Sequence, residues 1–442
     1  MPLPRWIELH WTPADTAPTR RDRIAGTYRA YLPELLAHRD LHIPEELSLK
    51  AAQVEHKIRN LAAAPAHKGL EGVTRFLLRS EAVSSSRIEG LAPAADKVAI
   101  AELSDSDDRI VKVTDTARAV AANVKILDDI EATDTSAEKF SLERLLTMQR
   151  TIIARSELHG IRKQQNWIGG SDWHPLDAEF VPPPPIYVPD LLEDLIRFIN
   201  GAAHGPLIQA AIAHAQFETI HPFADGNGRV GRAVIHTILQ RRGLCPSPIL
   251  PLSMVLATWS DKYLAGLSAF RALDDETRNS TVDTRCCDTA LAAWVDTFLT
   301  AADIAADEAQ RLFDDINELQ REWNEKFSSS RSSERKVRTD SLTARLLSSL
   351  ISQPMLTVDL VAQAYGVSAN TARAALNELT SLKILTRRSV GKNVHAFLAM
   401  DVFALVSAAE RQLASTRFNT KLSPPRRGGI PNIPTPPAPR DR

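Results

Sequence analysis

The sequence is poor in the features that mark secreted or membrane proteins. Its three cysteines, Cys245, Cys286 and Cys287, are too few for a disulfide framework and indicate thiols in a reducing compartment. No run of about 18 apolar residues occurs, and residues 1–5 lead into polar sequence rather than into the apolar part of a signal peptide. We therefore expect a cytoplasmic protein without a membrane partner.

The sequence also lacks an excess of charge of one sign. Its 53 Lys and Arg residues balance its 54 Asp and Glu residues, which gives a formal net charge of −1. The chain as a whole therefore has no strong electrostatic field for nucleic acid or an anionic membrane, although a local basic patch is compatible with this balance.

Two common site motifs are missing. The chain contains no G-x-x-x-x-G-K-[ST] sequence, which excludes an ordinary P-loop nucleotide site. His204, His214, His221 and His236 show neither H-x-x-x-H nor H-E-x-x-H spacing, and no cysteine is suitably placed near them, which argues against zinc. We expect His214, within an apolar helical stretch, to be packed or hydrogen-bonded.

What the chain does contain is helical periodicity. At 442 residues it exceeds the usual size of one core, which predicts two or three domains. Apolar residues recur at helical spacing through most of the chain, which predicts a mainly α fold. Helices are expected at residues 21–36, 44–61, 70–90, 98–103, 111–130, 140–153, 190–199, 207–220, 230–239, 263–270, 290–305 and 305–327.

The least helical part of the middle region lies between residues 160 and 185. Residues 167–170 and 180–181 are separated by Ser171, Asp172 and Pro175, which predicts a short β-hairpin. The prolines at 182–185 stiffen the chain where it leaves this hairpin.

The C-terminal part has a different organisation. Residues 328–333 are serine-rich and indicate a flexible linker, and residues 336–405 show the order helix, helix, turn, helix, hairpin of a winged helix-turn-helix. The chain after Ser415 is rich in proline, arginine and glycine, which predicts disorder. The expected divisions are 1–100, 101–305, 306–335, 336–405 and 416–442.

The stretch from His221 to Arg232 has the residues of a phosphate site. Its glycines, Gly226, Gly228 and Gly231, let backbone N–H groups approach an anion at the start of a helix. Arg229 and Arg232 share a helix face, where both can pair with phosphate oxygens. Asp225 can hold a magnesium ion, and His221 has a side chain suited to proton transfer near neutral pH.

Every fixed position of this stretch matches the H-x-F-x-[DE]-G-N-G-R-x-x-R signature, so the chain resembles Fic-domain proteins. Gly160 to Arg162 and the predicted hairpin are similar to the flap region of that family, and Tyr263 follows its downstream pattern more loosely. The resemblance covers roughly residues 70–305. It implies a helical Fic core with a β-hairpin flap that aligns a segment of the target protein.

The resemblance implies transfer of AMP from ATP to a hydroxyl of a target protein, with Mg²⁺ as cofactor. His221 would be the base that deprotonates the hydroxyl, and Asp225 would hold the metal. Arg229 would bind the γ-phosphate and Arg232 the β-phosphate, while Gly226, Asn227 and Gly228 would bind the α- and β-phosphates. The remaining nucleotide-binding residues expected from the resemblance are Val230, Gly231 and Tyr263.

Beside this motif, Ser85, Glu89 and Gly90 resemble the [ST]-x-x-x-E-[GN] inhibitory helix of the second class of Fic proteins. Taken alone, they indicate only a helix end with an acidic residue and a C-cap glycine. The resemblance implies that residues 80–90 are an inhibitory helix of the N-terminal region. We expect the Glu89 carboxylate to pair with Arg229 and to hold ATP in a non-productive pose.

Other functions remain open from the sequence. Arg373, Arg387, Arg388 and Lys392 of the expected winged helix can contact DNA phosphates, whereas Glu378 and the low number of basic residues favour a dimerisation or target-docking role. One alternative is therefore a DNA-binding regulator whose Fic core senses nucleotide. Another is a Fic enzyme with a different reaction, namely removal of AMP or transfer of UMP, phosphocholine or a phosphoryl group.

Overall fold

The computed structural model describes residues 4–13, 17–37, 39–63, 71–111, 113–132, 139–245, 247, 249–271, 284–330 and 341–416. Three sequence-based expectations therefore lie outside the described residues: the disordered tail after residue 416, the linker after residue 330, and the environment of the Cys286 and Cys287 side chains. Cys245 is buried and forms no disulfide, and its Sγ donates a hydrogen bond to the Ser247 carbonyl at 2.8 Å.

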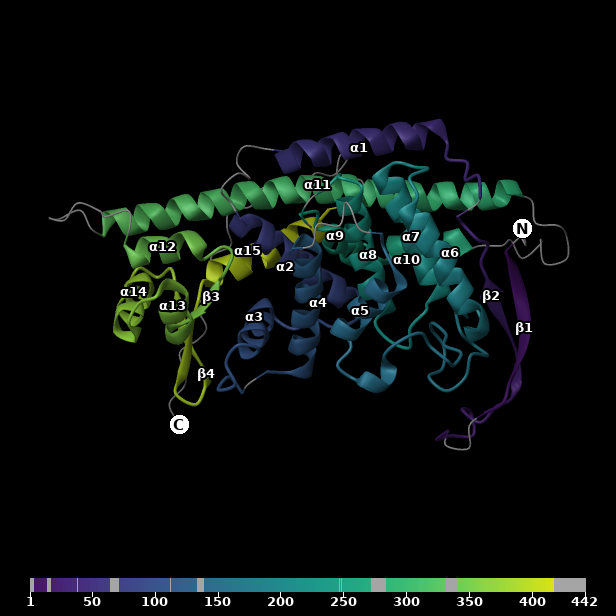
Figure 1. Ribbon diagram of the computed structural model, residues 1–442, viewed down its shortest axis with the longest axis horizontal. Helices are drawn as coiled ribbons and strands as arrows, with labels where there is room; N and C mark the ends of the chain where they lie inside the picture. Colours follow the sequence, from purple (N-terminus) through teal and green to yellow (C-terminus); the bar gives the residue numbers. More distant parts are fainter. Residues whose placement is uncertain are drawn as a thin grey trace.

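The described chain is mainly helical, which confirms the predicted fold class. Figure 1 shows α11 (Thr284–Ser329) running along almost the whole molecule, with α1 (Glu45–Ala63) on its outer side. The other elements before it are α2 (Glu71–Ile88), α3 (Ala95–Ser104), α4 (Asp115–Ala132), α5 (Leu142–Ile152), η2 (Ser156–Leu158), η3 (Pro185–Tyr187), α6 (Val188–Asn200), α7 (Pro206–Ile220), α8 (Asn227–Arg241), α9 (Leu252–Thr258) and α10 (Ser260–Arg271).

Helix α7 lies at the centre of the core, and all of its residues are buried. It is apolar on every side except for a few polar residues, which is the pattern of a helix surrounded by others. Those polar residues have defined partners: Gln209 donates to carbonyls at the end of α6, and His214 Nε2 lies 2.8 Å from the Tyr263 hydroxyl. Helix α7 thus places its last residues against α8 in a fixed position.

Helix α11 is continuous where the sequence predicts two helices and a domain boundary near residue 305. Its 46 residues contain no proline or glycine, so nothing in the sequence ends it there. By length and composition Asp288–Ser329 could cross a membrane, yet 56% of its most apolar window is buried inside the molecule. Trp294, Phe298 and Trp323 are fully buried, so the core accounts for its apolar composition.

The helix predicted at residues 21–36 is wrong. Residues Gly26–Leu32 form strand β2, which pairs antiparallel with β1 (Arg5–Trp11). Tyr28, Ala30 and Leu32 recur with a period of two, and Tyr31 makes an edge-on contact with Trp6 at 5.2 Å between ring centroids. Aromatic cross-strand pairing therefore overrides the helical spacing.

The predicted flap hairpin is present as a short antiparallel bridge between Ile168 and Phe180. The Ile168 N–H donates to the Phe180 carbonyl at 2.8 Å, and the Phe180 N–H returns a hydrogen bond at 3.2 Å. The next residue, Val181, accepts a hydrogen bond from the Tyr31 N–H at 2.9 Å. Strand β2 thus supports the flap from behind.

The C-terminal unit contains the elements expected at residues 336–405. They are α12 (Leu342–Ser349), β3 (Met355–Thr357), α13 (Val358–Tyr365), α14 (Ala369–Ser381), β4 (Thr386–Gly391), β5 (Val394–Leu398) and a further helix, α15 (Met400–Ala414). The strands form an antiparallel sheet in the order β3-β5-β4. Its assignment as a winged helix-turn-helix, and a role in binding DNA, stay predictions.

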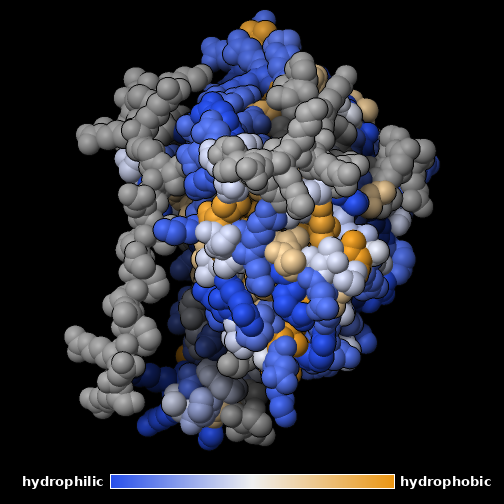
Figure 2. Space-filling model, turned by 90° about the vertical axis from the view of Figure 1, so that its left-hand side faces the viewer, coloured by the Kyte–Doolittle hydropathy of each residue, from blue (hydrophilic) through white to orange (hydrophobic). Residues whose placement is uncertain are grey.

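This unit packs against the rest of the molecule. Ala99, Ile100 and Leu103 of α3 form a small apolar core with Val390 and Leu398 of the sheet. Figure 2 looks at the end of the molecule that carries this unit, where the visible described surface is mostly hydrophilic with apolar side chains between. The expected boundary at residue 100 falls inside α3, whose residues on both sides of it face the C-terminal sheet.

Helix α15 returns from the C-terminal unit to α2. Its Glu410 forms an ion pair with Arg87 at 2.6 Å and accepts a hydrogen bond from the Ser84 hydroxyl at 3.5 Å. Further along α2, Arg79 Nη1 donates to the carbonyl of Ser352 at 2.5 Å. The helix that carries Ser85 is therefore held on one face by C-terminal residues.

Candidate active site

The loop between α7 and α8 begins at His221, which takes a left-handed backbone conformation with φ 48° and ψ 61°. This conformation ends α7, and it is uncommon for a residue other than glycine. Buried Arg162 stabilises it: Nε donates to the His221 carbonyl at 2.8 Å, and Nη2 donates to the Pro183 carbonyl at 2.5 Å. Asn166 Nδ2 also donates to the Phe223 carbonyl at 3.1 Å. The flap region thus fixes the position of His221.

The His221 imidazole is largely buried, with 19% of its side chain exposed. Burial, together with the neighbouring guanidinium groups of Arg271 and Arg162, lowers the pKa of His221 to about 4, and Glu89 and a hydrogen bond with the Glu218 backbone partly oppose this. The imidazole is therefore neutral at physiological pH, which is the state that a general base requires. Nδ1 has no hydrogen-bond partner among the described residues.

An anion cradle begins directly after this loop, and we use that name for Gly226, Asn227 and Gly228 at the start of α8. Gly226 has φ 86°, and a side chain there would be strained and would press on Ile153. The first turn of α8 leaves N–H groups without helical partners, and its dipole favours an anion at this end. The residues predicted to bind phosphate therefore lie at a helix N-terminus, and their binding role stays a prediction.

Asn227 has a second function within the cradle. Its Oδ1 accepts the Phe223 N–H at 2.8 Å, and its Nδ2 donates to the Phe223 carbonyl at 2.9 Å. Phe223 is fully buried against Phe217. Because both ends of the amide are used, the Asn227 side chain shapes the loop, and only its backbone faces a ligand.

Arg229 is the arginine of the motif whose N–H groups are mostly without partners among the described residues. Its side chain is 5% exposed, yet Nε and Nη1 have no hydrogen-bond partner among the described residues. The nearest carboxylate is Asp225, whose Oδ1 lies 4.0 Å from Nη2. Burial lowers the pKa of Arg229 because its charge is poorly compensated. A buried guanidinium with unpaired N–H groups is a strong site for an anion.

Asp225, Arg229 and Glu89 line a cavity of about 860 Å³. This volume lies at the upper end of the range for small-molecule sites. The wall opposite α8 comes from α4 and α5 and carries the cationic side chains of Arg118, Lys125 and Arg150. The lining also includes the acidic side chains of Asp105 and Asp115, and the cavity is large enough for a nucleoside triphosphate.

Arg232 is the arginine of the motif whose N–H groups are occupied by residues 85 and 89. Nε donates to the Ser85 hydroxyl at 2.9 Å, and Nη2 donates to the Ser85 carbonyl at 2.7 Å and to Glu89 Oε1 at 2.8 Å. Burial lowers the pKa of Arg232, but Glu89, together with Tyr263 and Glu218, more than offsets this and raises it above its ordinary value. Ser85 and Glu89 therefore meet the motif, as the resemblance implies.

The predicted partner of Glu89 is wrong, because the carboxylate pairs with Arg232 instead of Arg229. The end of α2 approaches α8 from the side of Arg232, where the Ser85 carbonyl and hydroxyl contact the same guanidinium. Arg229 instead turns toward Asp225 and the cavity. Helix spacing places both arginines on one side of α8, but the direction of approach of α2 decides which one is bound.

The Glu89 carboxylate also lies over the cradle. A Cβ atom built on Gly228 would overlap Glu89 Oε1, so the carboxylate occupies the space beside this glycine. Burial raises the pKa of Glu89, but Arg232, together with Arg229 and His221, more than offsets this, so the pKa lies below its ordinary value. Glu89 is therefore ionised at neutral pH and takes the place of an anion.

Gly90 ends α2, as predicted. It has φ 77°, which a side chain would disfavour, and the Leu91 N–H donates to the Ser86 carbonyl at 3.0 Å. This turn fixes where α2 stops and hence where Glu89 points.

Three predicted nucleotide-binding residues lie behind the cradle. Val230 is fully buried, and its N–H donates to the Gly226 carbonyl at 3.0 Å within the helix. Gly231 faces α7, where an added Cβ would lie 2.5 Å from Glu218 Oε1. Tyr263 is buried against His214 and Trp294. These residues support α8 from the core.

Sequence reasoning missed several residues that shape the site. Arg162 was noticed only as part of the flap region, and Asn166 and Arg271 carried no motif signal. Arg271 Nη2 donates to the Glu218 carbonyl at 3.0 Å, so it satisfies a group at the end of α7. Glu218 was noticed only as part of the helix that leads to His221. A carboxylate in an otherwise apolar helical stretch is the one signal that could have singled it out.

The donor set at Asp225 suits magnesium. Asp225 is 53% exposed and lines the cavity beside Arg229. Among the described residues, no group of three or more His, Cys, Asp or Glu side chains could hold a metal by itself. Mg²⁺ commonly binds one or two carboxylates together with water and substrate phosphates, so a single Asp next to an anion cradle fits.

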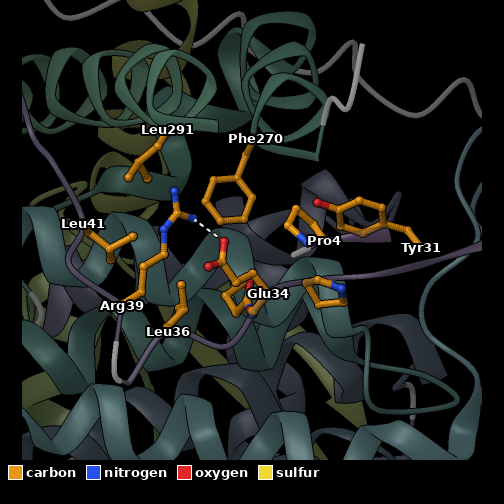
Figure 3. A pocket seen from close by; sticks show the side chains of 10 residues that line it. Pro4, Tyr31, Glu34, Leu36, Arg39, Leu41, Phe270 and Leu291 are labelled. Carbon is orange, nitrogen blue, oxygen red and sulfur yellow. Dashed lines mark hydrogen bonds and ion pairs between the residues drawn. The ribbon is translucent and has the colours of Figure 1, made fainter. Parts of the chain in front are cut away.

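A second cavity, of about 40 Å³, lies where the chain leaves β2 (Figure 3). Arg39 crosses it to Glu34 at 3.0 Å, with Phe270 and Leu291 on the opposite wall. It contains none of the residues of the motif, and its volume holds little more than water. Asp225 and Arg229 of the motif line the larger cavity and not this one.

Comparisons with known proteins agree with this location. Residues 139–239 match the model of the Fic/DOC family. "Protein adenylyltransferase fic-1" of Caenorhabditis elegans is 30% identical over 140 residues, which are 30% of this chain and 26% of that protein. "Probable protein adenylyltransferase aq_aa38" of Aquifex aeolicus is 31% identical over 184 residues, which are 40% of this chain and 52% of that protein. The chain thus spans between a quarter and about half of the length of these relatives.

Solved structures with similarity to the chain include a Fic family protein from Desulfovibrio desulfuricans, with a TM-score of 0.47 and 20% identity over 82% of this chain and 98% of that chain. Fic-1 from C. elegans has a TM-score of 0.43 and 19% identity over 60% of this chain and 71% of that chain. The matched segment 139–239 contains His221, Asp225, the cradle and both arginines. The similarity to the Fic/DOC family thus covers the segment that contains the cradle and His221.

Proposed function

We propose that the protein is a self-inhibited protein adenylyltransferase, which transfers AMP from ATP to a Ser, Thr or Tyr hydroxyl of a target protein and of itself. The observation that carries this proposal is the juxtaposition of a neutral His221, a helix N-terminus and a buried arginine with unpaired N–H groups. The names of the relatives support AMP as the transferred group.

The residues divide the reaction between them. The cradle N–H groups and Arg229 bind and orient the phosphates, so that the α-phosphate faces His221. His221 takes the proton of the target hydroxyl as its oxygen forms a bond to the α-phosphorus. The bond from that phosphorus to the bridging oxygen breaks, and pyrophosphate leaves with the electron pair. Arg229 stabilises the charge that develops on this leaving group.

Asp225 would hold Mg²⁺, which neutralises charge on the phosphates when it is bound. The exposed position of Asp225 leaves room for water and phosphate oxygens beside its carboxylate. The flap bridge between Ile168 and Phe180 would present backbone groups to an extended target segment.

Inhibition is attributed to Glu89. Its carboxylate occupies the space beside Gly228 and one arm of Arg232, where an anionic phosphate would otherwise lie. The carboxylate and a phosphate in the same space would repel each other. ATP therefore binds there only after the Glu89 carboxylate moves, or else ATP binds in a shifted pose. One charge-assisted hydrogen bond of this kind contributes about 1.5–3 kcal/mol, which is enough to keep most molecules closed.

The test is incubation of the Glu89→Gly protein with labelled ATP and Mg²⁺, alone and in a cell lysate, followed by mass spectrometry of modified peptides. We expect a peptide mass increase of about 329 Da, the covalent addition of AMP, at a hydroxyl residue. The protein with Glu89 should give a much weaker signal, and Glu89→Gly combined with His221→Ala should give none.

The other outcomes are informative. A different mass increase would assign another transferred group, and loss of AMP from a modified target in the presence of Glu89 would assign the reverse reaction. No modification by the Glu89→Gly protein, with its fold intact by circular dichroism, would refute the proposal. A cytoplasmic location, a homodimer and DNA binding by the C-terminal unit remain further proposals, which cell fractionation, light scattering and a salt-dependent mobility shift would test.

A further inference from the structure

Glu218 is a buried carboxylate in the central helix, one turn before His221. Its side chain is 7% exposed, and Oε2 lies 3.8 Å from His221 Nδ1. Glu218 Oε1 and His221 Nδ1 both lack a hydrogen-bond partner among the described residues. Oε1 faces Gly231, and Oε2 is the oxygen that lies nearest to the unpaired Nδ1, so a buried imidazole nitrogen without a partner lies next to a buried carboxylate.

The structure makes room for this carboxylate. Gly231 packs directly on it, and an added Cβ would lie 2.5 Å from Oε1 and 2.9 Å from Phe217 Cδ1. A larger residue at position 231 would therefore displace the Glu218 side chain. This explains why a glycine stands there, in a helix whose backbone at that point has no need of one.

The charges around Glu218 come from several helices. Burial raises the pKa of Glu218, Arg232 of α8 and Arg271 of α10 lower it, and the nearby Glu89 raises it, with a net value of about 7. His214 Nδ1 and Tyr263 also face this part of the core. Glu218 thus changes its charge close to neutral pH, while His221 stays neutral there.

We propose that Glu218 is a positioning residue for His221: its carboxylate accepts a hydrogen bond from Nδ1–H and so leaves Nε2 free to act as the base. The buried atom of the imidazole is Nδ1, so the exposed 19% of the side chain lies elsewhere on the ring. The present separation exceeds a hydrogen bond, and a small rotation of either side chain closes it. Contacts of this kind often shorten only when substrate binds.

This inference rests on the proposed adenylyltransferase function for its consequences in the reaction. When the target hydroxyl transfers its proton to Nε2, the imidazole becomes positively charged. The ionised Glu218 stabilises that charge through Nδ1–H and takes no proton itself. A protonated Glu218 would instead donate to Nδ1, which would put the imidazole proton on Nε2 and prevent it from acting as a base.

The kinetic test compares Glu89→Gly with Glu89→Gly/Glu218→Gln across pH 5 to 9, with ATP and Mg²⁺. Glu89→Gly should show kcat/KM rising to a plateau with an inflection below pH 7, because loss of Glu89 lowers the pKa of Glu218. The Gln variant should lose this inflection and fall by about tenfold to a hundredfold at pH 8. Glu308→Gln is the matched control, since Glu308 is also buried with a pKa raised by burial to about 7, but lies on α11.

A second measurement does not depend on activity. With ¹⁵N-labelled histidine in the full chain at pH 8, His221 should be protonated at Nδ1 and unprotonated at Nε2, with its signal assigned from His221→Ala. Glu218→Met, which cannot accept a hydrogen bond, should shift the population toward the other tautomer.

The kinetic measurement and the histidine spectra test the two proposals separately. If Glu89→Gly transfers no group, the proposed function fails, and the histidine spectra still decide the role of Glu218. If transfer occurs but Glu218→Gln keeps the inflection and the plateau within about twofold, or the tautomer is the same in Glu218→Met, the positioning role is refuted.

Discussion

The two arginines of the motif lie three positions apart on α8 and have opposite surroundings. Arg232 uses Nε and Nη2 on Ser85 and Glu89, whereas Arg229 leaves Nε and Nη1 without partners among the described residues. Both side chains are almost completely buried, at 2% and 5% exposure. Burial therefore does not distinguish them, and the presence of α2 does.

This difference indicates how the site is controlled under the proposed function. Helix α2 leaves His221, Asp225 and Arg229 ready and occupies only the Arg232 arm and the space beside Gly228. A small displacement of one carboxylate would then be enough to complete the site. The roles of Arg232, which pairs with Glu89, and of Arg229, which does not, can be tested separately.

The largest effect is expected when the Arg229 side chain is removed. In the Glu89→Gly background, Arg229→Ala should lower kcat/KM for ATP by about 10²–10³-fold, because a buried donor to the developing phosphate charge is lost. Arg241→Ala, at the other end of α8, should change it by less than about twofold. An equally small effect of Arg229→Ala would show that Arg229 does not bind the phosphates.

Removal of the Glu89 charge that pairs with Arg232 should change the rate less, and in the opposite direction. Glu89→Gln keeps the shape of the side chain and weakens its pairing with Arg232, so self-modification should rise by about tenfold, which corresponds to about 1.4 kcal/mol. The matched control is Glu34→Gln, which breaks the part-buried Glu34–Arg39 pair outside the motif. If Glu89→Gln left the rate unchanged while Glu89→Gly raised it, the volume of the side chain, and not its charge, would be responsible.

A smaller effect is expected from Ser85→Ala. This change removes the hydroxyl that accepts from Arg232 Nε but leaves the Ser85 carbonyl, which accepts from Nη2. Loss of one hydrogen bond of about 1 kcal/mol should raise self-modification by about fivefold. A decrease in the rate would mean that Ser85 orients Arg232 for catalysis instead.

The smallest effect concerns stability and pH. The pKa of Glu89 lies below its ordinary value, so its ion pair stabilises the fold above the unfolded pKa and is lost as pH falls through the folded pKa. The difference in melting temperature between the wild type and Glu89→Gln should therefore be constant from pH 6 to 8 and shrink below about pH 4.5. A difference that grows on acidification would contradict this assignment.

The sequence was sufficient for the features set by local residues. The motif from His221 to Arg232, the Gly90 turn and the flap bridge all depend on glycine positions, prolines and short spacings, and these predictions agree with the structure. The partner of Glu89 depends on the angle between α2 and α8, which no local pattern encodes. The same holds for Asn227, whose side chain is used by the loop that it follows.

The misread N-terminal strand has a related cause. Tyr28, Tyr31 and Leu35 satisfy a helical period, but the aromatic residues of β1 and β2 face each other only once the two strands pair. Glu218 lies outside the fixed positions of the motif, so the motif alone does not point to it. Its unpaired oxygen became apparent only with Gly231 and His221 in place around it.

The contacts of α2 with α15 have a thermodynamic consequence. Arg87 and Ser84 bind Glu410 on the turns of α2 that also carry Ser85 and Glu89. Any ligand of the C-terminal unit that favours separation of α15 from α2 changes the free energy of the Glu89–Arg232 contact, and by reciprocity ATP in the cavity changes the affinity for that ligand by the same factor. The two ends of the chain would then report on each other's occupancy through a single helix.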